Sequence, residues 1–456
     1  MMGINRLYKL ENENGVYWSN RPAALLIFAD ERAKIDIKSW KIYSVTGWFM
    51  NKKTPFEKIE RVEHSVIFKT KCNDEKLYYK INTNGLEYLI TLNSEQNIST
   101  NDIAFDMINN LKNFQSFWNI KMQVDISGGQ DSRVSAASVI RSDIQNFYFR
   151  SIADIDAEVN TAKHLLETIE NSHDFKIVNP AINMVNCPDL LERVDRLLFE
   201  FDGDFATVMM NSPIIESNKF IDLDKTFLNG FGGEISKGAF YASQKWIDKL
   251  ISKGENAAFY RLSTHLSKLG NIDDESIKLM EEELSIILNK SREFNFTGLK
   301  QLDFFHFHER IRRWSPLGDI VHSYSPFLSK YFISAGLNAC PIDNMNVILH
   351  KEIIDTLIPE WRNIDFFKAT PEQSKEKDKK NLRIWQTSDK NQVERILNNS
   401  ESWNDSFLEK DIVKLWEKAK EQGIPNYQET IFQRVVLRAR FNEHLIRINA
   451  VIDKIS

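Results

Sequence analysis

A glycine-rich loop, Ser127-Gly128-Gly129-Gln130-Asp131-Ser132, constrains the fold of this chain more than any other feature. The residues before it, MQVDIS, are typical of a buried strand, and those after it, SRVSAASVIR, predict a helix. A turn from a strand into a helix is where α/β folds bind phosphates, because unpaired backbone amides and a partial positive charge meet there. The loop therefore predicts an α/β fold with an anion site at this turn.

The segments on either side continue the alternation of strands and helices. Helices are expected at residues 105–118, 157–169 and 190–201, and a strand at residues 147–151. The segment FLNGFGGE ends a further strand. Strands that alternate with helices predict a parallel sheet.

The first hundred residues have a different character. Runs at Ala23–Ala29 and Ser65–Thr70 predict strands, and Asn84-Gly85 within NTNGLEYLITL predicts a hairpin. We therefore expect two domains: a small, mostly β domain at residues 1–100, and a parallel α/β domain at residues 101–456 with a helical C-terminal part.

The chain beyond Trp246 is expected to be mostly helical. The stretch Lys368–Lys380 interrupts this pattern, because nearly all of its residues are charged or polar. It predicts a solvated loop, with a mobile cover over the active site as the alternative.

Composition excludes several classes of protein. The 456 residues are 42% hydrophobic and 27% charged, which are globular values. A net charge of −5 argues against a nucleic-acid-binding protein, and no stretch approaches 18 apolar residues, so no membrane partner or signal segment is expected. Three cysteines are too few for a disulfide framework, which favours a cytoplasmic location.

The phosphate loop also carries a carboxylate. Asp131 would repel a phosphate unless a cation lay between them, so it is a candidate Mg²⁺ ligand. The alternative is an ordinary glycine turn between a strand and a helix. Other nucleotide-binding signatures are missing, since the sequence has no GxxxxGK[ST] and GFGGEI is not GxGxxG.

In five segments the chain resembles the asparagine synthetase family, whose synthetase domain is an ATP pyrophosphatase (PP-loop) domain of the adenine-nucleotide-hydrolase-like fold. Besides SGGQDS these are MMGI, which resembles MCGI, and KKTPFEKIERV, which resembles TPFxGIxRL. LNGFGGEISKGAFY resembles LSGEGxDExFGGY, and SPFLSKYFISAGLNACP resembles VPFLDxxFxxxAxxxP, followed by VILHKEIIDTLIPE. The order and spacing of the segments agree with the family.

The resemblance implies an activity and a set of site residues. The family adenylates a carboxylate with ATP, releases pyrophosphate, and lets an amine displace AMP to form an amide. It implies Mg²⁺ ligands at Asp131 and Glu234, which are also expected to be catalytic. The ATP-binding residues are expected to be Ser127, Gly128, Gly129, Gln130, Asp131, Ser132, Phe149, Asn229 and Gly230.

The chain departs from the family at three positions. The glutaminase nucleophile, a cysteine after the initiator methionine, is matched by Met2, and a thioether cannot act as that nucleophile. We therefore interpret residues 1–100 as a degenerate glutaminase-like domain. A catalytic-site glutamate is matched by Phe231. A lysine that stabilises the transition state is matched by Asn346; Lys351 is the candidate replacement, with a surface lysine as the alternative.

A cationic and aromatic segment, FFHFHERIRRW, is the other candidate replacement for the missing cation. Arg310 and Arg313 are three residues apart on one expected helical face, and guanidinium groups suit phosphate or carboxylate. We expect Arg313 to be catalytic. The alternative is that these arginines pair with Asp303 or Glu309. His306 and His308 are not expected to share a face or hold a metal.

Two functions follow from the sequence. The first is an ATP-dependent ligase that couples a small-molecule or glycan carboxylate to an amine, in glycan or natural-product biosynthesis, without its own glutamine hydrolysis; a homodimer is its candidate assembly. The second is a pseudoenzyme or assembly partner that binds nucleotide without catalysis, which Phe231 and Asn346 favour. A tRNA-thiolating relative is disfavoured, because it needs reactive cysteines and basic surfaces.

Overall fold

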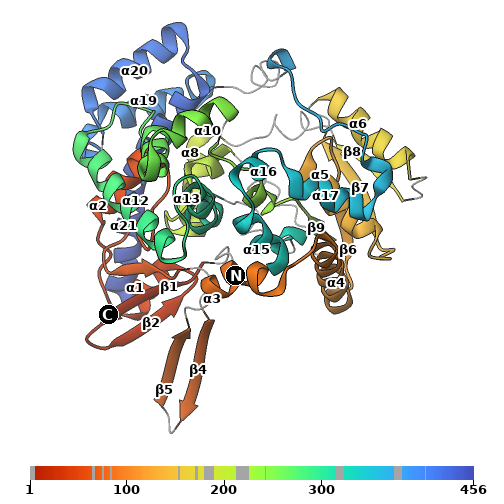
Figure 1. Cartoon of the computed structure of the whole chain (residues 1–456). Helices are drawn as coiled ribbons and strands as arrows, with labels where there is room; N and C mark the ends of the chain where they lie inside the picture. Colours follow the sequence, from red (N-terminus) through yellow and green to blue (C-terminus); the bar gives the residue numbers. More distant parts are fainter. Residues whose placement is uncertain are drawn as a thin grey trace.

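The computed structural model describes most of the chain and has two regions around separate cores (Figure 1). The described residues are 6–63, 67–73, 76–82, 85–152, 155–169, 173–178, 189–211, 225–241, 243–314, 323–373, 383–405 and 407–455. Among the helices of these residues, none combines the length and the apolar composition that a membrane span requires.

The central feature is a parallel sheet of five strands. These are β6 (Lys121–Asp125), β7 (Phe147–Ile152), β8 (Phe175–Val178), β9 (Lys225–Leu228) and β10 (Ser323–Tyr324). They lie in the order β10-β9-β6-β7-β8, and each pair of neighbours is parallel. The prediction of an α/β fold with a parallel sheet is confirmed.

The strand order creates a switch point between β6 and β9. From β6 the chain proceeds to β7 and β8 on one side of the sheet, and then returns to β9 and β10 on the other side. The loops that leave the carboxyl ends of β6 and β9 therefore run in opposite directions, and ligands of such sheets bind in the crevice between them. The expected phosphate loop follows β6, at this crevice.

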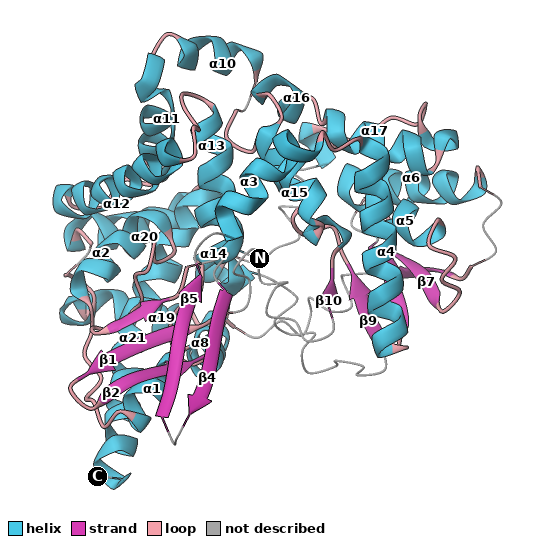
Figure 2. Ribbon diagram, turned by 60° about the horizontal axis from the view of Figure 1, so that its bottom comes forward, coloured by secondary structure: helices cyan, strands magenta, loops and turns pink. Residues whose placement is uncertain are grey.

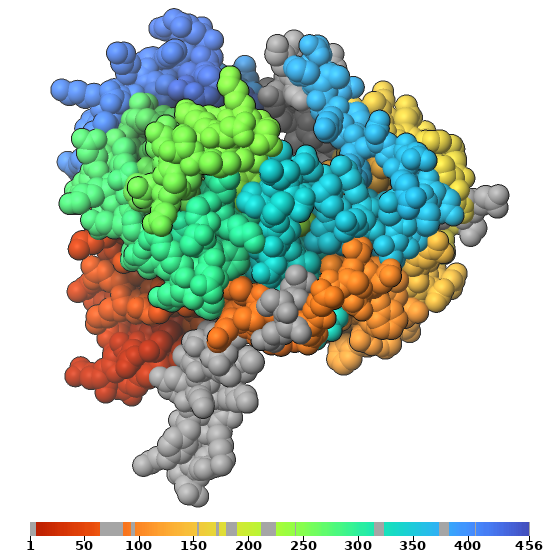
Figure 3. All heavy atoms as spheres, in the orientation of Figure 1, coloured from red at the N-terminus to blue at the C-terminus, as the bar shows by residue number. Residues whose placement is uncertain are grey.

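Helices surround the parallel sheet. The expected helices are present as α4 (Thr100–Trp118), α5 (Gln130–Ile140), α6 (Asp156–Glu167) and α8 (Leu190–Phe201). Helices α4, α5 and α17 (Ile348–Leu357) pack against one another, and Figure 3 shows the orange residues of α4 directly below the later cyan and blue segments. The first core contains apolar residues of this sheet and its helices, and it extends to apolar residues at 42–50 and 247–311.

The first sixty residues pack against the C-terminal helices. Strands β1 (Tyr8–Asn12), β2 (Gly15–Ser19) and β3 (Ile59–Arg61) form an antiparallel sheet in the order β2-β1-β3 (Figure 2). A 30-residue helix, α21 (Asn426–Ile455), contacts the N-terminal helices α1 and α2. The second core thus unites residues from both ends of the chain.

Two predicted elements of the N-terminal region are wrong. Residues Pro22–Phe28 form helix α1, not a strand, because Pro22, Leu25 and Leu26 recur at helical spacing and are buried. Residues Gly85–Gln96 form helix α3, not the second arm of a hairpin. The hairpin is instead made by β4 (Ile67–Asn73) and β5 (Lys76–Asn82). The region is therefore a mixture of strands and helices.

The remaining elements confirm that the chain beyond Trp246 is mostly helical. Apart from short 3-10 helices, the helices not yet named are α2 (Ile37–Thr46), α10 (Gln244–Ile251), α11 (Ala257–Leu266), α12 (Asp274–Glu293), α13 (Lys300–Phe305), a π-helix (His306–Ile311), α14 (Arg312–Trp314), α15 (Lys330–Asn338), α16 (Pro341–Met345), α19 (Lys390–Asn398) and α20 (Glu409–Gln422). Residues 368–372 of the expected polar loop are exposed, and residues 374–380 lie outside the described residues.

Candidate functional site

The loops after β6 and β9 meet at the switch point with very little space between them. A Cβ atom on Gly230 would lie 2.5 Å from the Asp131 Cβ, and one on Gly233 would lie 2.4 Å from Asp131 Oδ1. Gly232 has φ of +91°, a conformation that only glycine adopts readily. The glycines of the second loop are therefore needed so that Asp131 can fit against it.

The phosphate loop is held in shape by its own two serines. Ser127 Oγ and Ser132 Oγ share a hydrogen bond of 2.8 Å, and Ser132 Oγ accepts the Ser127 amide at 3.1 Å. Ser127 Oγ in turn accepts the Gly129 amide at 3.1 Å, where helix α5 begins. Because these donors and acceptors are paired with one another, a bound anion would have to compete for the same amides and hydroxyls.

A buried arginine ties the phosphate loop to a distant segment. Arg133 donates to the carbonyl of Gly128 at 3.2 Å and also to the carbonyls of Ile364 and Asp365. The Phe367 amide donates to the same Gly128 carbonyl at 2.9 Å. A Cβ on Gly128 would lie 2.3 Å from the Phe367 Cβ, so this position also requires glycine. Residues 364–367 thus pack directly on the loop.

Asp131 binds two basic side chains from different elements. His350 Nε2, on α17, lies 2.9 Å from Asp131 Oδ1, and Lys237 forms an ion pair with Oδ2. Burial alone would raise the pKa of Asp131, but the hydrogen bond with His350 and the charge of Lys237 lower it below its ordinary value. Asp131 is therefore ionised at neutral pH.

His350 links Asp131 to a serine on its other side. Its Nδ1 lies 3.1 Å from Ser236 Oγ, and burial holds the pKa of His350 below its usual range. A neutral ring that donates from Nε2 to Asp131 can accept from Ser236 at Nδ1. The order Asp-His-Ser is that of a hydrolase triad, but Ser236 is fully buried, so its hydroxyl cannot reach a substrate.

The helix that carries His350 begins at a strained residue. Val347 precedes α17 with φ of +57°, and a β-branched side chain in the left-handed region is an outlier. Such strain is typical of positions that the surrounding structure fixes for function. Here it sets the start of the helix that directs His350 at Asp131.

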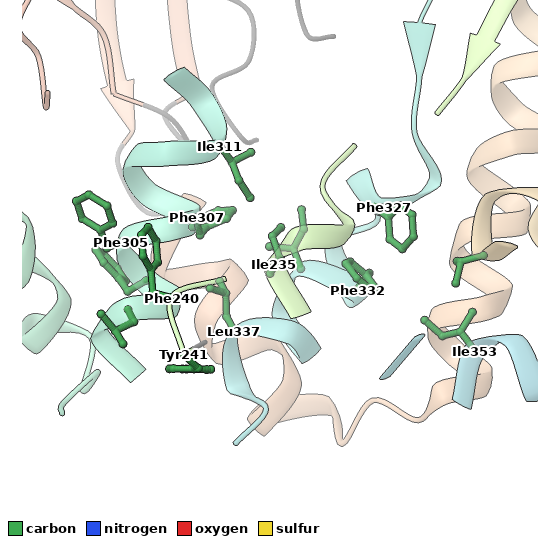
Figure 4. Packing of buried hydrophobic residues seen from close by; sticks show 14 of the residues in the cluster. Ile235, Phe240, Tyr241, Phe305, Phe307, Ile311, Phe327, Phe332, Leu337 and Ile353 are labelled. Atoms are coloured by element: carbon green, nitrogen blue, oxygen red, sulfur yellow. The ribbon is translucent and has the colours of Figure 1, made fainter. Parts of the chain in front are cut away.

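The second carboxylate, Glu234, lies in the short 3-10 helix Gly233–Ser236. Its Oε2 accepts the Gly232 amide at 3.0 Å. Burial and the negative charge of Asp131 together raise the pKa of Glu234, while Lys237 lowers it. In Figure 4 Ile235 of this helix lies between Phe307 on one side and Phe327 and Phe332 on the other, which fixes the position of the carboxylate.

A π-helix, His306–Ile311, brings Arg310 near Glu234. The Arg310 guanidinium lies 5.2 Å from the centre of the Phe240 ring, and burial lowers its pKa to about 10, partly opposed by the charge of Glu234. His306 is buried beside the same ring, and neither of its nitrogens has a hydrogen-bond partner. π-Helices are rare in proteins, and those that do occur are frequently found at functional sites.

Arg313 does not lie at this site, which corrects its expected catalytic role. Its guanidinium donates to Asp204 Oδ1 at 2.9 Å and to the carbonyls of Asn51 and Lys53. It also lies 3.7 Å from Glu309, as the structural alternative predicted. The wider turn of the π-helix removes the expected helical register between Arg310 and Arg313, so only Arg310 is near Glu234.

The structure also places Lys351 away from the site. It is exposed on α17, while its neighbour His350 is buried and contacts Asp131. Asn346 is exposed at the end of α16. Phe231, at the position of the family's glutamate, is partly buried and packs against the first core.

Three other expected site residues differ in exposure. Asn229 is mostly buried; it accepts the Phe231 amide at 3.0 Å and donates to Ser323 at 3.3 Å, so it shapes the second loop. Phe149 is fully buried in β7, with its ring 5.1 Å from that of Phe147. Gln130, the first residue of α5, is partly exposed.

The sequence interpretation missed Lys237 and His350. A signal for His350 was present, because His350, Ile353, Ile354 and Leu357 recur at helical spacing and all four are buried. A histidine on a buried helical face needs a polar partner. No comparable pattern distinguishes Lys237, which becomes notable only through its ion pair with Asp131.

Asp131 and Glu234 would be the ligands of a Mg²⁺ ion that arrived with a nucleotide. A carboxylate has about four acceptor positions, so the hydrogen bonds described above leave capacity for a cation. Mg²⁺ in nucleotide sites uses one or two carboxylates together with phosphate oxygens and water. Within the described residues, no group of three or more His, Cys, Asp or Glu is arranged to hold a metal ion.

Comparisons with known proteins give no family for this chain. A scan against protein-family models finds no match, and a search of curated proteins finds no significant match. The resemblance to the asparagine synthetase family therefore stays a prediction that rests on the quoted segments.

Proposed function

We propose that the chain is an ATP-dependent ligase that adenylates a carboxylate, releases pyrophosphate and joins the activated carboxyl group to an amine. The observation that carries this proposal is the meeting of the SGGQDS loop with a second glycine loop at the switch point of the parallel sheet. This crevice is where α/β sheets bind nucleotides. The specific PP-loop fold and its place in the asparagine synthetase family are part of the same proposal.

Each part of the crevice has a role in this reaction. The amides and serines of residues 127–132 would bind the ATP phosphates at the start of α5. Asp131 and Glu234 would hold Mg²⁺, which when bound would neutralise charge on the departing pyrophosphate. Asn229 and Gly230 would supply backbone to the adenine pocket. Ionised Asp131 is suited to this role because its pKa is held low.

The amine would come from solution or from another enzyme. Position 2 is methionine, so the chain has no nucleophile for glutamine hydrolysis at that place. We propose a small-molecule or glycan carboxylate and an amine as the substrates, and a cytoplasmic location for the reaction.

A pseudoenzyme that binds nucleotide without turning it over is the second candidate. In this structure both Asp131 oxygens already bind basic side chains, and the positions of the family's glutamate and lysine are Phe231 and Asn346. A site whose metal ligand is occupied by its own lysine could bind ATP and not react.

Calorimetry with ATP and Mg²⁺ tests the proposal when pyrophosphate release is followed in the same samples. Wild type should bind ATP and release pyrophosphate slowly, faster when the right carboxylate is supplied. Asp131→Ala should lose release by about 10²–10³-fold, as for other removed electrostatic groups, while staying folded. Binding without release across a carboxylate screen would favour the pseudoenzyme, and no ATP binding would exclude both candidates.

A further inference from the structure

The ammonium group of Lys237 lies at the centre of the candidate site. It forms an ion pair with Asp131, and about one fifth of its side chain is exposed. Its charge also acts on Glu234, His350 and His306. An ammonium has three donors, and the Asp131 ion pair uses one of them. Lys237 therefore has donors left for a ligand that enters the crevice.

Other cations near the site are engaged elsewhere. Arg133 donates to three backbone carbonyls, and Arg310 lies over Phe240 beside Glu234. Lys351 is exposed on the outer side of α17, and Arg313 is buried against Asp204. Unlike these four cations, Lys237 is both partly exposed and in direct contact with the phosphate loop.

We propose that Lys237 is a catalytic cation that binds the β- and γ-phosphate oxygens of ATP and then the pyrophosphate that leaves. This inference rests on the proposed function. Asp131 holds the ammonium at the crevice, and His350 holds Asp131 through its other oxygen, which makes His350 a positioning residue. The two loops and α17 thus supply one fixed positive charge.

Lys237 takes part in the reaction step only through its charge. A substrate carboxylate oxygen attacks the α-phosphorus, and the bond between that phosphorus and the oxygen bridging to the β-phosphorus breaks. The electron pair of that bond leaves with pyrophosphate. Lys237 lowers the energy of the negative charge that grows on the leaving group.

Calorimetry with inorganic pyrophosphate tests this role directly, because it measures binding independently of turnover. We would compare wild type, Lys237→Met, Lys237→Gln and Lys237→Arg, in EDTA and again with Mg²⁺. A charge-assisted hydrogen bond contributes enough that its loss should weaken pyrophosphate binding by about 10- to 100-fold. The arginine variant should recover most of the affinity in EDTA, since it keeps the charge.

A matched control is Lys245→Met, which removes an exposed lysine from the nearby helix α10. Its pyrophosphate affinity should equal that of wild type, and thermal melts should show that all variants fold. Pyrophosphate binding by Lys237→Met equal to wild type would overturn the role of Lys237 and leave the ligase proposal intact. Wild type that binds neither ATP nor pyrophosphate would overturn both.

Discussion

Asp131 and Asp204 each contact more than one basic side chain, and their settings differ. Asp131 contacts a lysine and a histidine at the crevice, and its side chain is 21% exposed. Asp204 contacts Arg313 at 2.9 Å, Arg61 at 3.4 Å and the Tyr8 hydroxyl at 2.6 Å, and its side chain is 2% exposed. Despite burial, which would raise it, the pKa of each aspartate is held below its ordinary value.

The difference lies in what each cluster connects. The Asp204 cluster joins the N-terminal strands β1 and β3 to the segment after α8 and to α14, so it is enclosed on all sides by the described chain. The Asp131 cluster lies at the carboxyl ends of β6 and β9 between two glycine loops, and about one fifth of the Asp131 side chain is exposed. Charge alone therefore does not identify a site; exposure and topology separate the two.

The largest effect should follow from Asp204→Asn. Arg61 and Arg313 would then lose the carboxylate that they share, and removing one partner of a buried ion pair costs about 3–5 kcal/mol. Urea denaturation would measure this loss, and Arg313→Ala should show one of similar size. ATP binding should stay within about twofold wherever the variant is folded, since a structural role does not change the crevice.

Asp131→Asn is the matched variant at the other aspartate. Because its ion pair is partly exposed, we expect its stability to change by no more than about 1 kcal/mol. Equal losses of stability for the two variants would remove the distinction between the clusters. A folded Asp204→Asn protein that had lost ATP binding would place Asp204 in the site.

The fold was predictable where periodicity was strong and unpredictable where a short run fitted two structures. Helices α4, α5, α6 and α8 and strands β6, β7 and β9 lie where the sequence predicts them. The seven residues of α1 were mistaken for a strand, because a short apolar run fits a buried strand and a buried helix equally well. For α3, Asn84-Gly85 predicts a hairpin, but Leu86, Leu89 and Ile90 recur at helical spacing and are buried.

The sequence predicts the two loops of the candidate site, but it does not predict which basic side chains contact Asp131. The loops are local, and their glycines and carboxylates are adjacent in the sequence. The cations depend on long-range packing, since Lys237 and His350 reach Asp131 from other elements. Arg310 and Arg313 could not be separated without knowledge of the π-helix, because an ordinary helical period places them on one face.

The pH dependence of stability should also distinguish the two clusters, and its effect is smaller. Beside the crevice, burial lowers the pKa of His306 to about 3, so this ring stays neutral in the folded protein, whereas its ordinary pKa is near 6.5. As pH falls from 7 to 5, His306 becomes protonated in the unfolded chain but not in the folded chain. Its contribution to the free energy of unfolding therefore falls by about 2 kcal/mol. Asp204 is ionised throughout this range, since its lowered pKa means that its contribution is lost only in stronger acid.

Urea denaturation of wild type and His306→Leu at pH 7, 6 and 5 measures this contribution. The variant should lose about 2 kcal/mol less than wild type over the interval, and Asp204→Asn should keep the wild-type slope. The difference between proteins is the relevant quantity, because the pKa of Asp303 is raised by burial to about 7 and acts in the opposite direction. Parallel slopes for wild type and His306→Leu would mean that His306 titrates normally.

The smallest effect is expected for Lys351→Ala. This variant tests whether the site extends from His350 to the next residue of α17. Lys351 is exposed and His350, beside it on α17, is buried against Asp131. Substitution of an exposed lysine should change stability by no more than about 0.5 kcal/mol. Pyrophosphate binding and release should match wild type, whereas His350→Leu, which removes the hydrogen bond to Asp131, should weaken both. If Lys351→Ala instead reduced pyrophosphate affinity tenfold, the fixed charge would come from α17 and not from Lys237.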